Sequence, residues 1–168
     1  MRAFSVCLFF WFVAIGIESS IVTLFPWFQP NLFFLFSTLF CLHWRGAETY
    51  FIALIFGITV DCFSTLPFGI FAFVFFIFSF FIRWYAIKIY QESPIIIVIL
   101  IGIFDLALNV LIYFIISMVF GVNQFTFQWL LELVINEVLM TAVLAIPTYT
   151  LLLMIENRFK IRLSERKF

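Results

Sequence analysis

The chain has 168 residues, of which 66% are hydrophobic and only 11% are charged, with nine basic and nine acidic side chains. A soluble domain of this size cannot bury so much apolar surface, because its core would be too small. We therefore expect an all-α integral membrane protein. The balanced charge gives no indication of a nucleic-acid partner.

The first two apolar segments differ in how well they match a membrane span. A helix needs about 20 apolar residues to cross about 30 Å of hydrocarbon, and residues 3–25 satisfy this. Residues 27–44 form a thinner candidate, because the continuous apolar part, Asn31 to Leu42, reaches only about 18 Å as a helix. The sequence leaves the reality of this second span open.

Residues 49–66 and 67–82 are predicted as the third and fourth spans, joined by a tight turn over Ser64 and Thr65. Arg83 to Ser93 is polar enough to be a loop. The two spans together form a helical hairpin whose turn lies between two strongly apolar runs.

The stretch from Gly57 to Gly69 organises this hairpin, because it combines a carboxylate, a proline and two glycines. A carboxylate is costly inside a membrane, so Asp61 lies near the membrane surface or is held by a partner. Glycine allows backbones to approach closely, and Pro67 suits the first turn of a helix. The candidate packing or partner-contact residues here are Gly57, Asp61, Pro67 and Gly69.

The fifth and sixth spans are predicted at residues 94–120 and 129–155. A turn signal, Gly121 to Gln124, separates them. Residues 156–168 then form a basic, amphipathic tail, expected on the cytoplasmic side. This tail suits an anchor on anionic membrane lipid or a docking site for a cytoplasmic protein.

Six spans predict that all nine basic residues lie on one side of the membrane, because no Lys or Arg falls in the opposite loops. By the positive-inside rule this side is cytoplasmic, with both termini there. Without the second span, only Arg2 would change sides. The charge distribution therefore favours a six-transmembrane-helix bundle.

Polar side chains inside the last two spans are spaced four residues apart and share helix faces. Asp105 and Asn109 form one such row, and Glu137 and Thr141 form another. Intramembrane carboxylates usually face a bundle interior, where they join helices by hydrogen bonds, contact a partner helix or line a ligand cavity. All three interpretations stay open for the candidate residues Asp105, Asn109, Asn136 and Glu137.

Residues suited to catalysis or metal binding do not form a recognisable motif. The single histidine, His43, has no nucleophile placed to pair with it. The three cysteines form no C-x-x-C pair, and the sequence holds no H-E-x-x-H motif or Gly-rich phosphate loop. We predict no catalytic, cofactor or metal site, and a protein that is not an enzyme.

A family resemblance covers essentially the whole chain. The length, the six predicted spans, the cytoplasmic termini and the segment Gly57-x3-Asp61…Ser64-Thr65-Leu66-Pro67-Phe68-Gly69 resemble the bacterial rod shape-determining protein family MreD. The sixth span, with Asn136, Pro147 and the Glu156-Asn157-Arg158 exit, is also similar. The family more often has Thr-Pro-x-Gly where this chain has Thr-Leu-Pro-Phe-Gly.

The resemblance implies a non-enzymatic membrane scaffold of the cell-wall elongation machinery, located in the bacterial inner membrane and maintaining rod shape. Its expected partner is an MreC-like bitopic protein, and through it MreB, RodA and the elongation transpeptidase. The implied fold is similar to the substrate-binding subunits of energy-coupling-factor transporters. A vitamin-binding subunit is therefore the alternative function, which would need a polar pocket near the outer face.

Overall fold

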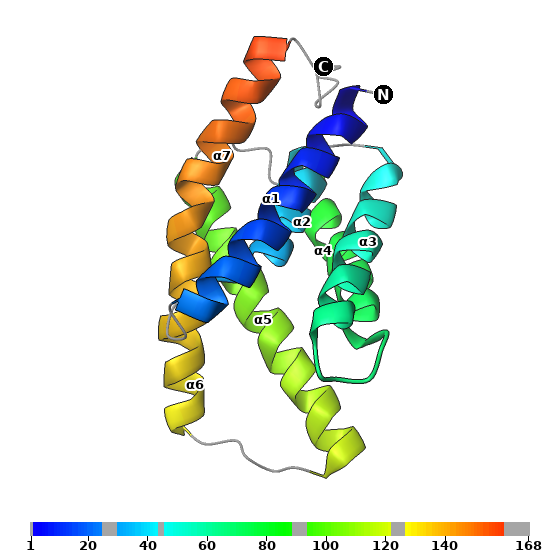
Figure 1. Cartoon of the computed structure of the whole chain (residues 1–168), viewed down its shortest axis with the longest axis vertical. Coiled ribbons are helices and arrows are strands. Elements are labelled where there is room, and N and C mark those ends of the chain that lie inside the picture. Colours follow the sequence, from blue (N-terminus) through cyan, green and yellow to red (C-terminus); the bar gives the residue numbers. More distant parts are fainter. Residues whose placement is uncertain (1, 25–29, 44–45, 89–93, 122–126, 160–168) are drawn as a thin grey trace.

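The computed structural model describes residues 2–24, 30–43, 46–88, 94–121 and 127–159. These residues form six helical stretches, and no strand occurs among them, which confirms the all-helical expectation (Figure 1). In chain order they are α1 (Arg2–Leu24), α2 (Leu32–His43), α3 (Glu48–Phe63), α4 (Ile70–Lys88), α5 (Pro94–Phe120) and one continuous helix made of α6 (Phe127–Leu133), the π-helical turn η1 (Val134–Val138) and α7 (Leu139–Phe159).

Two of these helices are long and apolar enough to cross a membrane. Ile95–Val119 in α5 and Leu131–Ile155 in the last helix each provide 25 residues, and an 18-residue stretch of each has a mean hydropathy of 2.9 and 2.2, respectively. Such a length corresponds to about 37 Å of helix, more than the 30 Å or so of a bilayer core. Shorter apolar segments lie in α1, α2 and α4. By length and composition, two helices are thus candidate membrane spans.

The boundaries of α4 differ from the sequence-based prediction of 67–82. The helix begins three residues later, at Ile70, because Gly69 adopts a φ of +104°, outside the helical range. It continues to Lys88, through the first part of the predicted loop, and so includes Arg83, whose side chain binds Gly46 and Thr49 at the start of α3. Residues 89–93 lie outside the described residues.

The other helix boundaries agree with the prediction for α5 and differ from it for α2 and for the last helix. α5 covers the predicted residues 94–120, whereas α2 begins only at Leu32, after Asn31. The predicted extension of α2 toward residues 27 and 44 falls largely outside the described residues. The last helix continues through residues 156–159 of the expected tail, and residues 160–168 are likewise not described.

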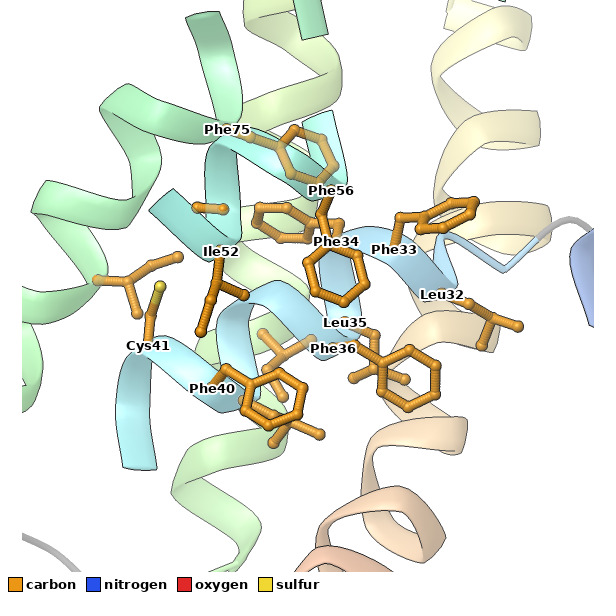
Figure 2. Packing of buried hydrophobic residues seen from close by; sticks show 14 of the residues in the cluster. Leu32, Phe33, Phe34, Leu35, Phe36, Phe40, Cys41, Ile52, Phe56 and Phe75 are labelled. Carbon is orange, nitrogen blue, oxygen red and sulfur yellow. The ribbon is translucent and has the colours of Figure 1, made fainter. Parts of the chain in front are cut away.

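Helix α2 lies at the centre of the structure and is buried on every side. All ten residues from Leu32 to Cys41 are buried, and α1, α3, α4, α5 and α7 all pack against this helix. Figure 2 shows phenylalanine rings from α2 meeting Phe56 and Phe75 of the neighbouring helices. A helix that is apolar on all faces is expected to be buried in this way.

Arg83 connects α4 to α3 at the end of the hairpin that is opposite the turn. Its guanidinium donates hydrogen bonds to the carbonyl oxygen of Gly46 and to Oγ1 of Thr49, the latter at 3.2 Å. The same group lies 5.2 Å from the centre of the Tyr50 ring, within the range of a cation–π contact. The basic side chain thereby links the last part of α4 to the start of α3.

The helix ends gather at two opposite ends of the molecule. The start of α1 and the end of α7 lie together, whereas the α3–α4 turn, the end of α5 and the start of α6 lie toward the other end (Figure 1). The lower parts of α5 and α6 extend beyond the α3–α4 turn.

Candidate functional site

The first candidate site is the α3–α4 joint, which consists of Gly57 and Asp61 on α3 and of Phe71 and Ala72 on α4. At Gly57 the two backbones are in direct contact. A Cβ atom there would lie 2.6 Å from Cα of Ala72 and 2.8 Å from the carbonyl oxygen of Phe71. Because both neighbours are backbone atoms, only glycine fits without moving one helix.

Asp61, one helical turn after Gly57, caps the N-terminus of α4. Its Oδ1 accepts a hydrogen bond from the Phe71 backbone N–H at 3.0 Å, and its Oδ2 accepts one from the Ala72 N–H at 2.9 Å. The side chain is only 3% exposed. The first N–H groups of a helix lack intrahelical acceptors and favour a negative charge. Both oxygens of this buried carboxylate are therefore partnered within the chain.

The turn between α3 and α4 sets the angle of this joint. The Ser64 N–H donates to the Val60 carbonyl at 2.9 Å at the end of α3, and the Phe73 N–H donates to the Gly69 carbonyl at 3.0 Å at the start of α4. Pro67 is exposed in the turn, not in the first turn of α4 as predicted. The left-handed φ of Gly69 is the conformation that requires glycine.

The second candidate site is a polar cluster around the N-terminus of α2. On α1, Glu18 Oε1 accepts hydrogen bonds from the N–H groups of Leu32 and Phe33, at 2.8 and 3.3 Å. Asn31 is the N-cap of α2, because its Oδ1 accepts from the Phe34 N–H at 3.1 Å. Side chains thus satisfy the first three N–H groups of α2. The members of the polar cluster are Glu18, Asn31, Asp105, Asn109, Glu137 and Thr141.

Helices α5 and α7 complete the polar cluster. Nδ2 of Asn31 donates to Asp105 Oδ1 at 3.3 Å, and the Asn31 N–H donates to Thr141 Oγ1 at 3.0 Å. Nδ2 of Asn109 donates to Glu137 Oε1 at 3.1 Å. These bonds connect the start of α2 to residues 74 and 110 positions away in sequence.

Glu137 lies in the π-helical turn η1, where one extra residue per turn changes the direction of the side chains that follow. Thr141 donates its hydroxyl to the Glu137 carbonyl at 2.8 Å, one turn later. The two polar residues thereby face α5 and α2 from the middle of a long apolar helix. π-Turns of this kind occur frequently at functional sites.

The polar cluster contains three carboxylates, and no Lys or Arg among the described residues forms an ion pair with them. Asp105 is fully buried, and its Oδ2 has no hydrogen-bond partner. An unpartnered buried acceptor costs about 1–3 kcal/mol. Within the described residues, no group of three His, Cys, Asp or Glu side chains is placed to hold a metal ion.

The structure assigns the predicted residues to different places. Gly57 and Asp61 meet in the α3–α4 joint, and Gly69 and Pro67 lie in its turn. The polar cluster brings together Asp105, Asn109 and Glu137, whereas Asn136 contributes no hydrogen bond to it.

Two members of the polar cluster, Glu18 and Asn31, were not among the predicted packing or partner-contact residues. The position of Asn31 directly before an apolar run is the N-cap signal that could have indicated it. No local signal identifies Glu18 as a capping residue, because the N–H group that it binds belongs to Leu32 on another helix.

Comparison with known proteins found no matching protein family, no matching curated protein and no matching solved structure. The two sites are therefore interpreted from their geometry. Carboxylates and amides in these positions join helices through capping and interhelical hydrogen bonds. In the polar cluster, Asp105 also leaves one buried acceptor free.

Proposed function

We propose that this chain is a six-span helical bundle of the bacterial inner membrane, with both termini in the cytoplasm. In this proposal it is a non-enzymatic scaffold of the cell-wall elongation machinery and maintains rod shape by binding an MreC-like bitopic partner. MreB, RodA and the elongation transpeptidase are reached indirectly, through that partner.

The observation that carries this proposal is the α3–α4 joint. The segment from Gly57 to Gly69, on which the resemblance to the MreD family rests, forms a close helix contact, a buried cap and a glycine-dependent turn. Each of these features depends on a residue of the segment. The segment therefore fixes how α3 and α4 pack together. This supports a scaffold function, because a scaffold needs a fixed helix arrangement to present a binding surface.

The proposed membrane topology is supported by helix lengths and by the positions of basic residues. Besides the two candidate spans, α1 has 23 residues and α4 has 19. One end of the molecule holds the start of α1 and the end of α7. The helices that begin or end there carry four basic residues in these parts, namely Arg2, Arg83, Lys88 and Arg158. The positive-inside rule would place this end in the cytoplasm. The short α2 would count as a crossing only together with its connecting residues.

Purification from native membranes in mild detergent, followed by mass spectrometry of the co-purifying proteins, tests the proposal. We expect to recover a bitopic protein together with cell-wall synthases. The variant Gly57→Leu should disrupt that recovery, whereas Gly16→Leu, at a position where a Cβ meets no atom within 4 Å, serves as the matched control. Recovery of neither class of protein with the unmodified chain would contradict the proposed function.

The alternative, a substrate-binding subunit of a vitamin transporter, is favoured by one observation. Helix α2 begins inside the bundle, and Asp105 beside it has a free buried oxygen. Helix ends inside a bundle form substrate sites in several transporter folds. Co-purification of ATPase subunits, a coupling membrane protein and a bound small molecule would support this alternative over the scaffold.

A further inference from the structure

The polar cluster places one fully buried carboxyl group beside two half-buried ones. Asp105 on α5 is 0% exposed, whereas Glu18 on α1 and Glu137 in η1 are half-buried. The Asn109 amide donates to Glu137 Oε1 and to the Asp105 carbonyl oxygen, at 3.1 Å in each case, and so keeps these two residues together. In their ionised forms the carboxylates of Asp105 and Glu137 repel each other, and those of Glu18 and Glu137 do so too.

The parts of the chain that form the polar cluster contain no cationic side chain. No Lys, Arg or His occurs between Arg2 and His43, or between Lys88 and Arg158. These two ranges include the segments of α1, α2, α5, η1 and α7 that meet in the polar cluster. The helices that supply the three acidic groups therefore supply no positive charge to balance them.

Helix α4 also packs against α5, but it directs its polar groups elsewhere. The Tyr85 ring meets Phe104, and the Arg83 guanidinium donates to Gly46 and Thr49 at the start of α3. Among the described residues, no basic group interacts with any of the three carboxyl groups of the polar cluster. A positive charge at this place has to come from outside the described chain.

The hydrogen-bond donors around Asp105 are already in use. Its Oδ1 accepts from Asn31 Nδ2 at 3.3 Å, whereas its buried Oδ2 accepts from no described group. The Thr141 hydroxyl donates to the Glu137 carbonyl oxygen instead. A buried acceptor without a donor and a buried charge without a counter-charge are both unfavourable. A group that brings positive charge to Oδ2 removes both costs.

A small cation with a single charge suits this position. A water molecule would donate to Oδ2 but would leave the charge of the carboxylate uncompensated. Within the described residues, no three His, Cys, Asp or Glu side chains are placed to hold a metal ion, so the carboxylates do not converge as a divalent cation requires. Because Asp105 and Thr141 are completely buried, a bulky organic cation does not fit.

We propose that the polar cluster binds one small monovalent cation, a proton or a sodium ion, at Oδ2 of Asp105. A sodium ion would add neutral oxygens such as that of Thr141, whose hydroxyl lies next to Asp105. Helix ends and irregular turns inside a bundle coordinate such cations in membrane transporters, and here α2 begins beside the π-helical turn η1. The proposal goes beyond the proposed function, because it applies to a scaffold and to a transporter subunit alike.

Thermal unfolding of the full chain in detergent tests sodium ions and protons separately. Sodium chloride replaces choline chloride at constant ionic strength and pH. If sodium is the cation, the unfolding temperature should rise by about 3–5 °C for each tenfold increase in concentration above the dissociation constant. If the proton is the cation, sodium should have no effect, and the unfolding temperature should rise as the pH falls from mildly alkaline to mildly acidic, because the folded state binds the proton. An unfolding temperature that responds to neither cation would overturn the proposal.

The variant Asp105→Asn tests whether the response belongs to this carboxyl group. It keeps an acceptor oxygen for Asn31 but removes the negative charge, so the response to sodium or to pH should be lost. Glu48→Gln, at an exposed acid on α3, is the matched control and should respond as the unmodified chain does. The measured quantity is the change of unfolding temperature with cation concentration, so a variant that is merely less stable still shows the response. An undiminished response in Asp105→Asn would overturn the proposal.

Infrared difference spectroscopy of the folded protein gives a second readout that does not depend on stability. Uptake of a proton converts a carboxylate into a carboxylic acid with its own carbonyl band, and binding of sodium shifts the bands of the carboxylate. We expect one of these signals in the unmodified chain and in Glu48→Gln, and its loss in Asp105→Asn. A difference spectrum without a carboxyl signal, or the same signal in Asp105→Asn, would overturn the proposal.

Discussion

Asp61 and Glu18 each hold the start of the helix that follows their own, yet their surroundings differ. Asp61 uses both oxygens, one for each of two N–H groups of α4, and lies one turn from a direct backbone contact at Gly57. Glu18 accepts both of its hydrogen bonds through one oxygen and belongs to a cluster in which Asp105 has an oxygen without a partner.

The comparison indicates two uses of buried carboxylates. A fully partnered group in a close contact fixes the geometry of two helices, because any change leaves donors unsatisfied or atoms overlapping. A partly partnered group such as Asp105, whose carboxylate accepts one hydrogen bond from Asn31, contributes less to the fold, and its removal disturbs fewer bonds. We therefore expect substitutions in the α3–α4 joint to be more harmful than comparable substitutions in the polar cluster.

The largest effect is expected from Gly57→Ala, because the added Cβ would overlap backbone atoms of α4. We expect a loss of about 2–3 kcal/mol, as for overpacking of a close contact. Thermal unfolding in detergent, followed by size-exclusion chromatography, measures it. The control is Gly102→Ala, whose Cβ would lie 3.8 Å from Ala142 and should be tolerated. Equal stability of the two variants would show that α3 and α4 are not in close contact.

The next effect is expected from Asp61→Ala, which leaves the Phe71 and Ala72 N–H groups without an acceptor. Loss of a cap together with unsatisfied buried donors should cost about 2–3 kcal/mol. Asp61→Asn keeps one acceptor oxygen and should cost about half as much. The same unfolding assay applies, with Glu48→Ala, at an exposed carboxylate in the first turn of α3, as the control. If Asp61→Ala unfolds like this control, the cap does not stabilise the joint.

A smaller effect is expected from Gly69→Ala. The φ of +104° at this residue strains any side chain, and the cost should be about 1–2 kcal/mol. Gly121→Ala provides the comparison, since its φ of +66° lies in the left-handed helical region that other residues tolerate better. We expect unfolding temperatures to decrease more for Gly69→Ala. The reverse order would show that the stability of the joint does not depend on the backbone conformation of Gly69.

The smallest effect is expected from Asp105→Asn in the polar cluster. The amide oxygen can still accept from Asn31, and the substitution removes a carboxylate that lacks a partner for one oxygen. We expect stability to change by less than about 1 kcal/mol in either direction. If Asp105→Asn lost more stability than Asp61→Asn in the same assay, the polar cluster would contribute more to the fold than the α3–α4 joint, contrary to our expectation.

Local signals in the sequence were sufficient where a helix is long and bounded by strong stop residues. Pro94 and Gly121 enclose the apolar run that became α5, and the periodic rows placed Asp105 with Asn109 and Glu137 with Thr141 on shared faces. These features depend only on residues within a few turns of one another, so periodicity captures them.

Contacts between distant segments could not be predicted in this way. The start of α4 depends on Asp61, which lies on a different helix, and the cap of α2 depends on Glu18 and Thr141. The sequence likewise shows that α2 is apolar but not whether lipid or protein surrounds it. Burial of a helix on every side is a property of the assembled bundle.

The burial of α2 has a consequence for the order of assembly during synthesis. Twelve residues form a helix of about 18 Å, and its first N–H groups would lie in an apolar medium without the side chains that satisfy them. Glu18 and Asn31 accept from the N–H groups of Leu32 to Phe34, but the N–H of Asn31 itself donates to Thr141, which is translated 110 residues later. We therefore expect the segment of α2 to reach its final position only after the C-terminal helix has been inserted, so that its stable incorporation depends on nearly the entire chain being present.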